Sequence, residues 1–429
     1  MKGRGTMRKS KAVFWLCAFF VAFFTFAGQT ALASENGYRL AKVLVLSRHN
    51  LRTPTSNGSK VLASLTPHAW FDWTGAPGDL SLKGGQLETI MGQYFRQWLE
   101  NEGLLEANAV PEGGEMRFYA NSFQRTVATA HYFSAGMLPM ANVEIERHFA
   151  LNESDPVFLP KPAASFSDEF RARAMREVEA MGGVNGLGKR MEPNTKLIAD
   201  VLDFKDSRYA RENGLTAFPV QDLKFDFDTL RLTGSLILAG RASDALSLQY
   251  YEAEEKEAAR AAFGHTLTFA QWRDVSKVKD MGIAAYFQLP TMAKAFAAPL
   301  LDVMRDELLN DGRSFTFLCG HDVNLSTVLP SLGVEEYTLR DTIEEKAPIG
   351  AKLVIEKRIG EDGEAYVSLK LVYQSARQMQ NREPLSLNHP PVVVPIKLQG
   401  LQANGDGLYL FDDVIERFEE VIAEVGEAA

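Results

Sequence analysis

The chain has 429 residues, of which 46% are hydrophobic and 24% are charged, and its formal net charge at pH 7 is −9. This length exceeds one typical hydrophobic core, so it predicts two domains or one domain with a large insertion. The acidic balance and the lack of a Lys/Arg stripe argue against nucleic acid and anionic membranes as partners, so any affinity for anions must come from a local cluster of cations.

The first 33 residues have the pattern of a secretory signal peptide. Five basic residues precede an apolar run at 12–27, and Ala31-Leu32-Ala33 is a small-residue cleavage site. The run is shorter than the about 20 residues that span a membrane, so we expect cleavage after Sec-dependent export to the periplasm. Loss of five basic and no acidic residues changes the net charge from −9 to −14. Cys17 leaves with this segment, and Cys319, at the end of an apolar run, is interpreted as a small buried residue.

A buried strand is predicted at residues 43–46, and the polar string SRHNLRTPT follows it. Loops that leave the carboxyl ends of strands form the ligand sites of open α/β sheets. This loop contains Arg48, His49 and Arg52, and therefore offers two guanidinium groups and an imidazole to one site.

A second strand is predicted at residues 116–120. Asn121 or Ser122 is the expected N-cap of the helix that follows. This assignment places Arg125 in the first helical turn, where free backbone N–H groups and the helix dipole favour an anion.

The middle of the chain changes to helical periodicity with few β-branched runs. We predict an all-α domain at 151–300, inserted into an α/β domain that is formed by 34–150 and 301–429. The string GVNGLGKR at 183–190 is similar to a phosphate-binding loop. No Ser or Thr follows Lys189 and a helical pattern precedes the string, so nucleotide binding is not expected there.

Strand character returns at residues 315–319, and the string CGHDVN follows with His321 and Asp322. A β-hairpin is predicted at 352–373, and an acidic amphipathic helix at 411–425. Because both polar strings follow buried strands, we expect one site that is assembled from the two ends of the sequence.

Three motifs together carry a resemblance to a known family. RHNxRxP at 48–54, NSxxRTxxTA at 121–130 and GHDxN at 320–324 resemble the histidine acid phosphatases, the branch with the bacterial phytases and periplasmic glucose-1-phosphatase. The segments LSLKGGQLETIMGQYFRQWL, DALSLQYYE and APIGAKLVIEKR are similar to glucose-1-phosphatases in the same order. The resemblance covers most of the mature chain. It implies a phosphoglycerate-mutase-like three-layer α/β domain with an inserted all-α domain.

The residue types fit phosphate transfer without a metal or another cofactor. A neutral imidazole can attack phosphorus, so His49 is the candidate nucleophile and a phosphohistidine is the expected intermediate. Asp322 is the candidate general acid, because a leaving alkoxide must be protonated as the P–O bond breaks. The chain has neither a cysteine pair after signal cleavage nor an HExxH helix, so metal ligation is not expected.

Phosphate binding is assigned to the arginines and to the second histidine. Arg48, Arg52 and Arg125 are expected to hold the phosphoryl oxygens, because a guanidinium presents a planar donor fork and keeps its charge. His321 would add a further donor to the same oxygens.

Two residues bear on specificity. The phytases of the family usually have glycine at the position of Asn50, whereas glucose-1-phosphatases have asparagine. An asparagine tolerates a left-handed backbone and adds an amide for a substrate oxygen, and the alternative is a tolerated turn residue. Glu252 matches an acidic residue that resembles a ligand of sugar hydroxyls, and the alternative is a solvated carboxylate at a helix end.

We therefore predict an exported acid phosphatase for phosphate monoesters, above all sugar phosphates such as glucose-1-phosphate. A phytase is the nearest alternative, but a phytate pocket must be rich in Lys and Arg. A mutase of the same superfamily is disfavoured by the signal peptide, and an inactive sugar-phosphate binding protein by the presence of both His49 and Asp322. The expected partner is a small phosphate ester, and the expected oligomeric state is a monomer or a homodimer.

Overall fold

The computed structural model describes residues 37–160, 167–226 and 231–428. The chain divides into two compact units, residues 1–32 and 33–429, and all described residues belong to the second. The predicted signal peptide lies outside the described residues. Within the described part of the chain, no helix is long and apolar enough to cross a membrane.

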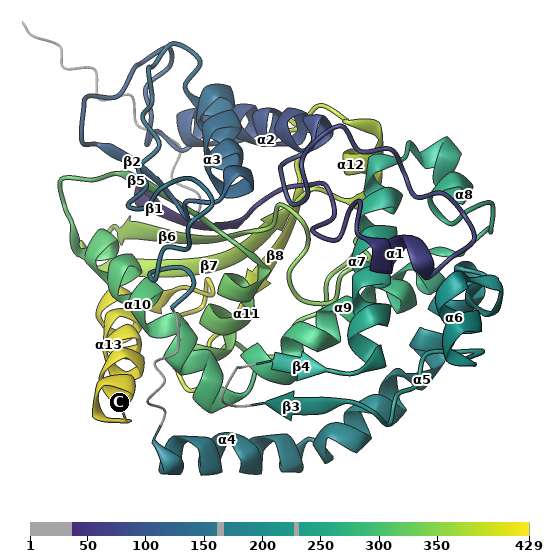
Figure 1. The fold of residues 1–429 in the computed structure, drawn as a ribbon. Coiled ribbons are helices and arrows are strands. Elements are labelled where there is room, and N and C mark those ends of the chain that lie inside the picture. The colour runs from purple at the N-terminus through teal and green to yellow at the C-terminus, as the bar shows by residue number, and fades with distance from the viewer. Residues whose placement is uncertain (1–36, 161–166, 227–230, 429) are drawn as a thin grey trace, which may run out of the picture. The chain divides into compact units, whose positions relative to one another are not determined.

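A seven-stranded mixed sheet is the centre of the fold (Figure 1). Its strands run in the order β2-β5-β1-β6-β7-β8, and β9 pairs with β7. β5 is parallel to both of its neighbours, whereas β6, β7, β8 and β9 pair in antiparallel fashion. The strands are β1 (Tyr38–Arg48), β2 (Met116–Ala120), β5 (Phe315–Gly320), β6 (Lys352–Gly360), β7 (Ala365–Tyr373), β8 (Val392–Ile396) and β9 (Tyr409–Leu410).

Side chains of β1 alternate between two hydrophobic cores, one on each face of the sheet. Val43 and Val45 belong to the core beneath α2 (Leu82–Asn101) and α3 (Gln124–Met137). Leu44 and Leu46 belong to the opposite core, against α10 (Pro290–Leu309), α11 (Asp322–Ser331) and α13 (Phe411–Ala428). Burial on both faces explains why β1 is a continuous apolar run, and the predicted three-layer α/β architecture is confirmed.

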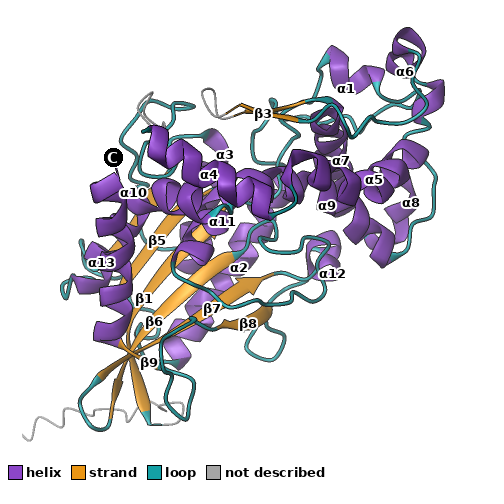
Figure 2. Cartoon of the chain, turned by 90° about the horizontal axis from the view of Figure 1, so that it is seen from below, coloured by secondary structure: helices purple, strands orange, loops and turns teal. Residues whose placement is uncertain are grey.

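The segment between α3 and α10 is mainly helical and lies beside the sheet (Figure 2). It also contains a two-stranded sheet that the sequence did not predict, and the predicted domain boundary at 300 falls inside α10. The boundaries of the inserted domain at 151–300 stay predictions. The elements of this segment are α4 (Asp168–Ala180), α5 (Gly183–Val201), η1 (Phe204–Asp206), α6 (Arg208–Asn213), β3 (Lys224–Asp226), β4 (Arg231–Thr233), α7 (Ser235–Glu252), η2 (Glu255–Glu257), α8 (Ala258–Ala261) and α9 (Phe269–Phe287).

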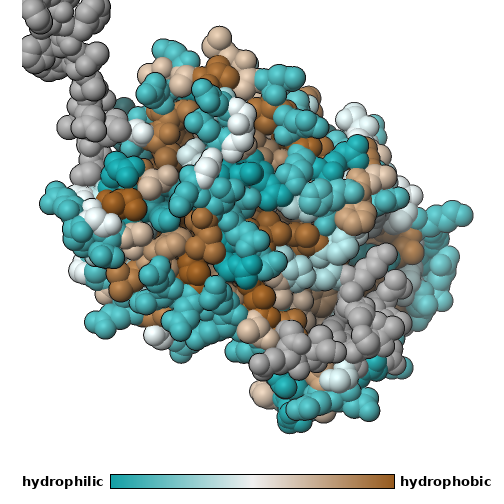
Figure 3. Space-filling model, turned by 90° about the vertical axis from the view of Figure 1, so that its left-hand side faces the viewer, coloured by the Kyte–Doolittle hydropathy of each residue, from teal (hydrophilic) through white to brown (hydrophobic). Residues whose placement is uncertain are grey.

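Several local predictions hold in the structure. The string GVNGLGKR begins α5 and follows helix α4, so it lacks the preceding strand of a phosphate-binding loop. The predicted hairpin is β6–β7, and Cys319 is fully buried in the core beneath α2 and α3. Two short helices, α1 (Lys60–Ser64) and α12 (Ala376–Asn381), complete the fold. On the face in Figure 3, hydrophobic residues lie between hydrophilic ones, as is usual for a protein surface.

Candidate active site

The two polar strings of the sequence meet at the carboxyl ends of β1 and β5. Arg48 is the register partner of Gly320, and the N–H of His49 donates to the Gly320 carbonyl at 2.9 Å. The rings of His49 and His321 pack edge to face with their centroids 5.4 Å apart. The parallel pairing of these strands thus joins the two ends of the sequence in one site.

His49 is held in one tautomer. Its Nδ1 lies 2.8 Å from the backbone carbonyl of Asn50, and because a carbonyl only accepts, Nδ1 carries the proton and Nε2 keeps its lone pair. The ring is 3% exposed. Burial lowers the pKa of His49 well below its usual range, and the charge of Arg125 adds to this effect. His49 is therefore a neutral imidazole even in acidic solution.

Arg48 is a buried cation with a spare donor. Its Nη1 donates to the carbonyl of Ala347 at 2.5 Å, and its Nη2 pairs with Asp322 Oδ2 at 3.1 Å. Among the described residues, its buried Nε has no hydrogen-bond partner. An unsatisfied buried donor costs about 1–3 kcal/mol, so an oxyanion at this position would be stabilised.

Arg52 and Arg125 supply two more guanidinium groups. Arg52 makes a bidentate pair with Asp244 of α7, at 3.0 and 3.2 Å. Arg125 stacks on the ring of Phe123, and its Nε is a second buried donor without a partner among the described residues. Burial, helped by the charge of Arg52, lowers the pKa of Arg125 to about 10. The site therefore has open donor positions for an anion.

The N-terminus of α3 is capped differently from the prediction. The N-cap is Phe123, which offers no side-chain cap, and the N–H of Gln124 donates to Asn152 Oδ1 at 3.1 Å. Neither predicted capping residue is available, because Ser122 Oγ accepts from the N–H of Phe149 and Asn121 bonds to His321. Arg125 nevertheless lies in the first turn of α3, as predicted.

His321 is oriented by Asn121. The Oδ1 of Asn121 accepts from the N–H of Asp155 at 3.0 Å, so its Nδ2 donates to His321 Nε2 at 2.8 Å. The proton of a neutral His321 then lies on Nδ1, which remains a donor. Burial and the charge of Arg125 lower the pKa of His321 well below its usual range.

Asp322 is ionised in this state of the protein. Burial raises its pKa, but the charges of Arg48 and Lys279 outweigh burial and lower the pKa to about 2. An acid must hold a proton, so Asp322 needs one before it can protonate a leaving group. A phosphate that competes for Arg48 would weaken the ion pair and raise the pKa of Asp322.

This competition predicts a pH dependence. The monoanion of a phosphate ester, which predominates below a second pKa of about 6, carries the proton that Asp322 lacks. We expect kcat/KM for glucose-1-phosphate to fall about tenfold per pH unit above about pH 6, and not to fall between pH 6 and 5 because His49 stays neutral. Initial rates across this range, with EDTA present, measure it. A kcat/KM that rises from pH 6 to 8 would contradict it.

The side chain of Asn50 does not have the predicted geometry. Its Nδ2 donates to Glu88 Oε1 at 2.6 Å and its Oδ1 accepts from the N–H of Leu51 at 2.7 Å, so both ends of the amide are occupied within the protein. Asn50 is also absent from the residues with a positive φ, and no left-handed turn explains its presence. In this state the buried Glu88 carboxylate binds the amide, and the expected bond to a substrate oxygen stays a prediction.

Glu252 lies at the C-terminal end of α7 and contacts Ser81. Its Oε2 accepts from Ser81 Oγ at 3.1 Å, and burial raises its pKa against the opposing charges of Lys83 and Arg382. It is thus not a fully solvated helix-end carboxylate. Two turns earlier on α7, Asp244 contacts Arg52, which the sequence analysis missed although Asp244 begins the DALSLQYYE segment.

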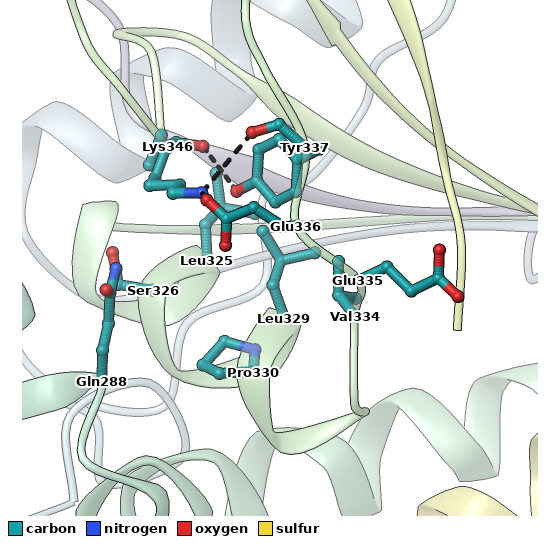
Figure 4. A pocket seen from close by; sticks show the side chains of 11 residues that line it. Gln288, Leu325, Ser326, Leu329, Pro330, Val334, Glu335, Glu336, Tyr337 and Lys346 are labelled. Atoms are coloured by element: carbon teal, nitrogen blue, oxygen red, sulfur yellow. Dashed lines mark hydrogen bonds and ion pairs between the residues drawn. The ribbon is translucent and has the colours of Figure 1, made fainter. Parts of the chain in front are cut away.

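One pocket of the described chain lies beside α11. This pocket is lined by apolar side chains and by polar ones that include Gln288, Ser326 and Lys346, and the Lys346 ammonium pairs with Glu336 (Figure 4). Tyr337 OH donates to the Lys346 carbonyl at 2.9 Å, so Lys346 is bonded within the protein through both its side chain and its backbone. Within the described residues, no group of three or more His, Cys, Asp or Glu has an arrangement that could hold a metal ion.

Comparisons with known proteins show which family the chain belongs to. The family described as histidine phosphatase superfamily (branch 2) matches residues 39–373. The glucose-1-phosphatase of Salmonella typhimurium is 34% identical over 399 residues, 90% of this chain and 94% of that protein. The glucose-1-phosphatase of Providencia rettgeri is 32% identical over 397 residues, 90% and 92% of the two chains. The structure of a phytase from Citrobacter braakii has a TM-score of 0.81 and 26% identity, and covers 92% of this chain and 99% of that one.

Proposed function

Because the chain belongs to branch 2 of the histidine phosphatase superfamily, we propose that it hydrolyses phosphate esters of neutral, hydroxyl-rich alcohols, with glucose-1-phosphate as the representative substrate. That it is a histidine acid phosphatase, a phosphoric monoester hydrolase, follows from the family and from relatives at 32% and 34% identity. The identity of the alcohol depends on the charges around the arginines.

The observation that carries the choice of alcohol is a set of carboxylates, which we call the carboxylate ring, and two of them form ion pairs with the arginines: Asp322 with Arg48 and Asp244 with Arg52. Burial lowers the pKa of Arg48, but the four carboxylates that act on it outweigh burial and raise the pKa. We define this carboxylate ring as Asp244, Asp280, Asp322 and Glu344. A single phosphate can replace the carboxylates on Arg48 and Arg52. Further phosphates of a polyanion would be repelled by the displaced Asp244 and Asp322 carboxylates, whose side chains are partly exposed.

The proposed reaction has two steps with balanced proton transfer. Nε2 of His49 attacks phosphorus, the P–O bond to the alcohol breaks, and Asp322 gives a proton to the leaving oxygen. Water then attacks the phosphohistidine, returns a proton to Asp322 and releases inorganic phosphate. The arginines and His321 stabilise the charge on the equatorial oxygens in both steps.

A phytase is the second candidate, and the likeness to the Citrobacter braakii phytase favours it. That likeness covers 92% of the chain but at 26% identity, below the 34% of the Salmonella typhimurium glucose-1-phosphatase. The bidentate pairing of Arg52 with Asp244 argues for the sugar phosphate, because it places a carboxylate beside a cation that a polyphosphate needs.

Removal of a ring carboxylate should change the preference between these substrates. We expect the wild type to prefer glucose-1-phosphate to phytate in kcat/KM. Asp244→Asn and Asp280→Asn should each raise the phytate to glucose-1-phosphate ratio by about tenfold, or about 1.4 kcal/mol, because less negative charge opposes the polyanion. Phosphate release from both substrates measures the ratio.

The control for this experiment is Asp311→Asn, which removes a carboxylate that is 93% exposed, so we expect the substrate ratio to change by less than about twofold. Glu252→Gln tests separately the candidate ligand of the sugar hydroxyls. A wild type that prefers phytate would favour the phytase. A ratio that responds to Glu252 and not to Asp244 would instead assign the sugar hydroxyls to Glu252.

We also propose that the enzyme acts in the periplasm after removal of residues 1–33. The support is the sequence of that segment, with its basic start, apolar run and small-residue cleavage site. N-terminal sequencing of the enzyme purified from a periplasmic extract tests this proposal. A mature protein that begins at Met1 or Met7 would contradict it.

A further inference from the structure

A buried polar network lies directly behind the turn that carries His49. Asn50, Glu88 and Lys352 are at most 1% exposed. Glu88 Oε1 accepts from Asn50 Nδ2 at 2.6 Å and from Lys352 Nζ at 3.0 Å. Lys352 Nζ also donates to the carbonyl of Gly350 at 2.9 Å. These contacts define the Asn50–Glu88–Lys352 network, which joins the turn after β1 to α2 and to the start of β6.

The network fixes the peptide group that orients His49. The carbonyl of Asn50 accepts the Nδ1 proton of His49, while the N–H of Asn50 donates to Thr129 Oγ1 at 3.1 Å. The side chain of Asn50 is bonded at both ends, to Glu88 and to the N–H of Leu51. Every polar group of Asn50 therefore has a partner, and its carbonyl can point in one direction only.

The loop before β6 closes the other side of this turn. Gly350 has a φ of +70°, and a Cβ there would lie 2.6 Å from Asn50 Nδ2. Its N–H donates to the carbonyl of His49 at 3.2 Å. Only a glycine fits this position without displacing the Asn50 amide, so the backbone on both sides of His49 is packed against the network.

Stability alone does not explain a charged pair at this depth. A buried ion pair is often no better for stability than apolar residues of the same volume. Glu88 Oε2 is buried and, within the described residues, has no hydrogen-bond partner, which makes the network costly. A buried network that costs folding free energy in this way is consistent with a role in holding nearby catalytic groups in a fixed orientation.

We propose that the Asn50–Glu88–Lys352 network positions His49, by fixing the Asn50 carbonyl that keeps the proton on Nδ1 and presents Nε2 to phosphorus. The inference rests on the proposed role of His49 as nucleophile. No hydrogen bond among the described residues joins the network to Arg48, Arg52 or Arg125. The network therefore governs the rate of phosphoryl transfer and not the affinity for phosphate.

The test compares catalysis with phosphate binding in variants of Asn50, with p-nitrophenyl phosphate as substrate and inorganic phosphate as competitive inhibitor. Asn50→Asp places a carboxylate against Glu88, and we expect kcat to fall about 100-fold while the Ki of inorganic phosphate changes less than about threefold.

Two further variants distinguish a loss of catalysis from a loss of folding stability. Asn50→Ala removes the amide without adding a charge, and we expect a loss of kcat of about 10–100-fold. The matched control is Lys42→Met, which replaces a buried lysine near the other end of β1, where Nζ donates to carbonyls at the end of α10. Lys42→Met should lower the melting temperature and leave the kcat of the folded enzyme unchanged.

The outcomes separate this inference from the proposed function. If folded Asn50→Ala keeps kcat within about threefold of the wild type, or if the Ki of phosphate rises in step with the loss of kcat, the network does not position His49. A wild type that traps no phosphohistidine would overturn the proposed function itself.

Discussion

Replacement of His49 by alanine is expected to abolish turnover, with a loss of kcat of about 10⁴-fold or more for every substrate. The arginines can still bind phosphate in this variant, but no other group occupies the position from which a lone pair would reach phosphorus. Rapid quench of the wild type should trap a phosphoprotein that is labile in acid and stable in base. Steady-state rates and the trapped label together measure the effect.

The matched control is His131→Ala, because His131 lies exposed on α3 and leaves the site intact when it is removed. His131→Ala should trap the same amount of phosphoprotein as the wild type, and the melting temperature of His49→Ala should stay close to the wild-type value. A folded His49→Ala variant that keeps more than about a tenth of the activity would exclude covalent catalysis through this residue.

Replacement of Asp322 by asparagine should harm substrates in proportion to the basicity of their leaving groups. Glucose-1-phosphate releases a strongly basic alkoxide, so we expect kcat to fall by about 10²–10⁴-fold. The p-nitrophenolate ion leaves largely without a proton, so the loss for p-nitrophenyl phosphate should be much smaller. An asparagine can still accept a hydrogen bond from Arg48, which limits disturbance of the arginine. Paired measurements of kcat on the two esters give the result.

The control for Asp322 is Asp311→Asn, since the Asp311 side chain is 93% exposed. This variant should treat both esters as the wild type does. Equal losses on the two esters in Asp322→Asn would assign Asp322 to the structure of the site or to the water step alone. A larger loss for the p-nitrophenyl ester would exclude general acid catalysis of alcohol release.

Local sequence was sufficient for the framework of this protein. The apolar runs before His49 and before His321 predict buried strands, and the structure contains them as parallel neighbours, β1 and β5. A strand that is buried on both faces has a continuous apolar run in its sequence, so these two strands can be predicted from the sequence alone. The polar residues that follow each strand then fall at one edge of the sheet.

The same reasoning located the arginines, because their positions follow from short-range geometry. Arg48 is the last residue of its strand and Arg125 lies in the first turn of its helix, whichever residue caps that helix. The exact cap was wrong by one or two positions. Asn121 and Ser122 have partners that are far away in sequence, and local propensity contains no information on such partners.

Only the tertiary structure decided where polar side chains point and which charges they carry. Asn50 is bonded to Glu88, 38 residues away, and Arg52 to Asp244, 192 residues away. The low pKa of Asp322 likewise depends on Arg48, which is the last residue of a different strand. A residue type states what bonds are possible, but burial and the nearest opposite charge choose among them. The sequence alone determined the fold class and the family of this enzyme, whereas packing between distant segments set the protonation and orientation of its site.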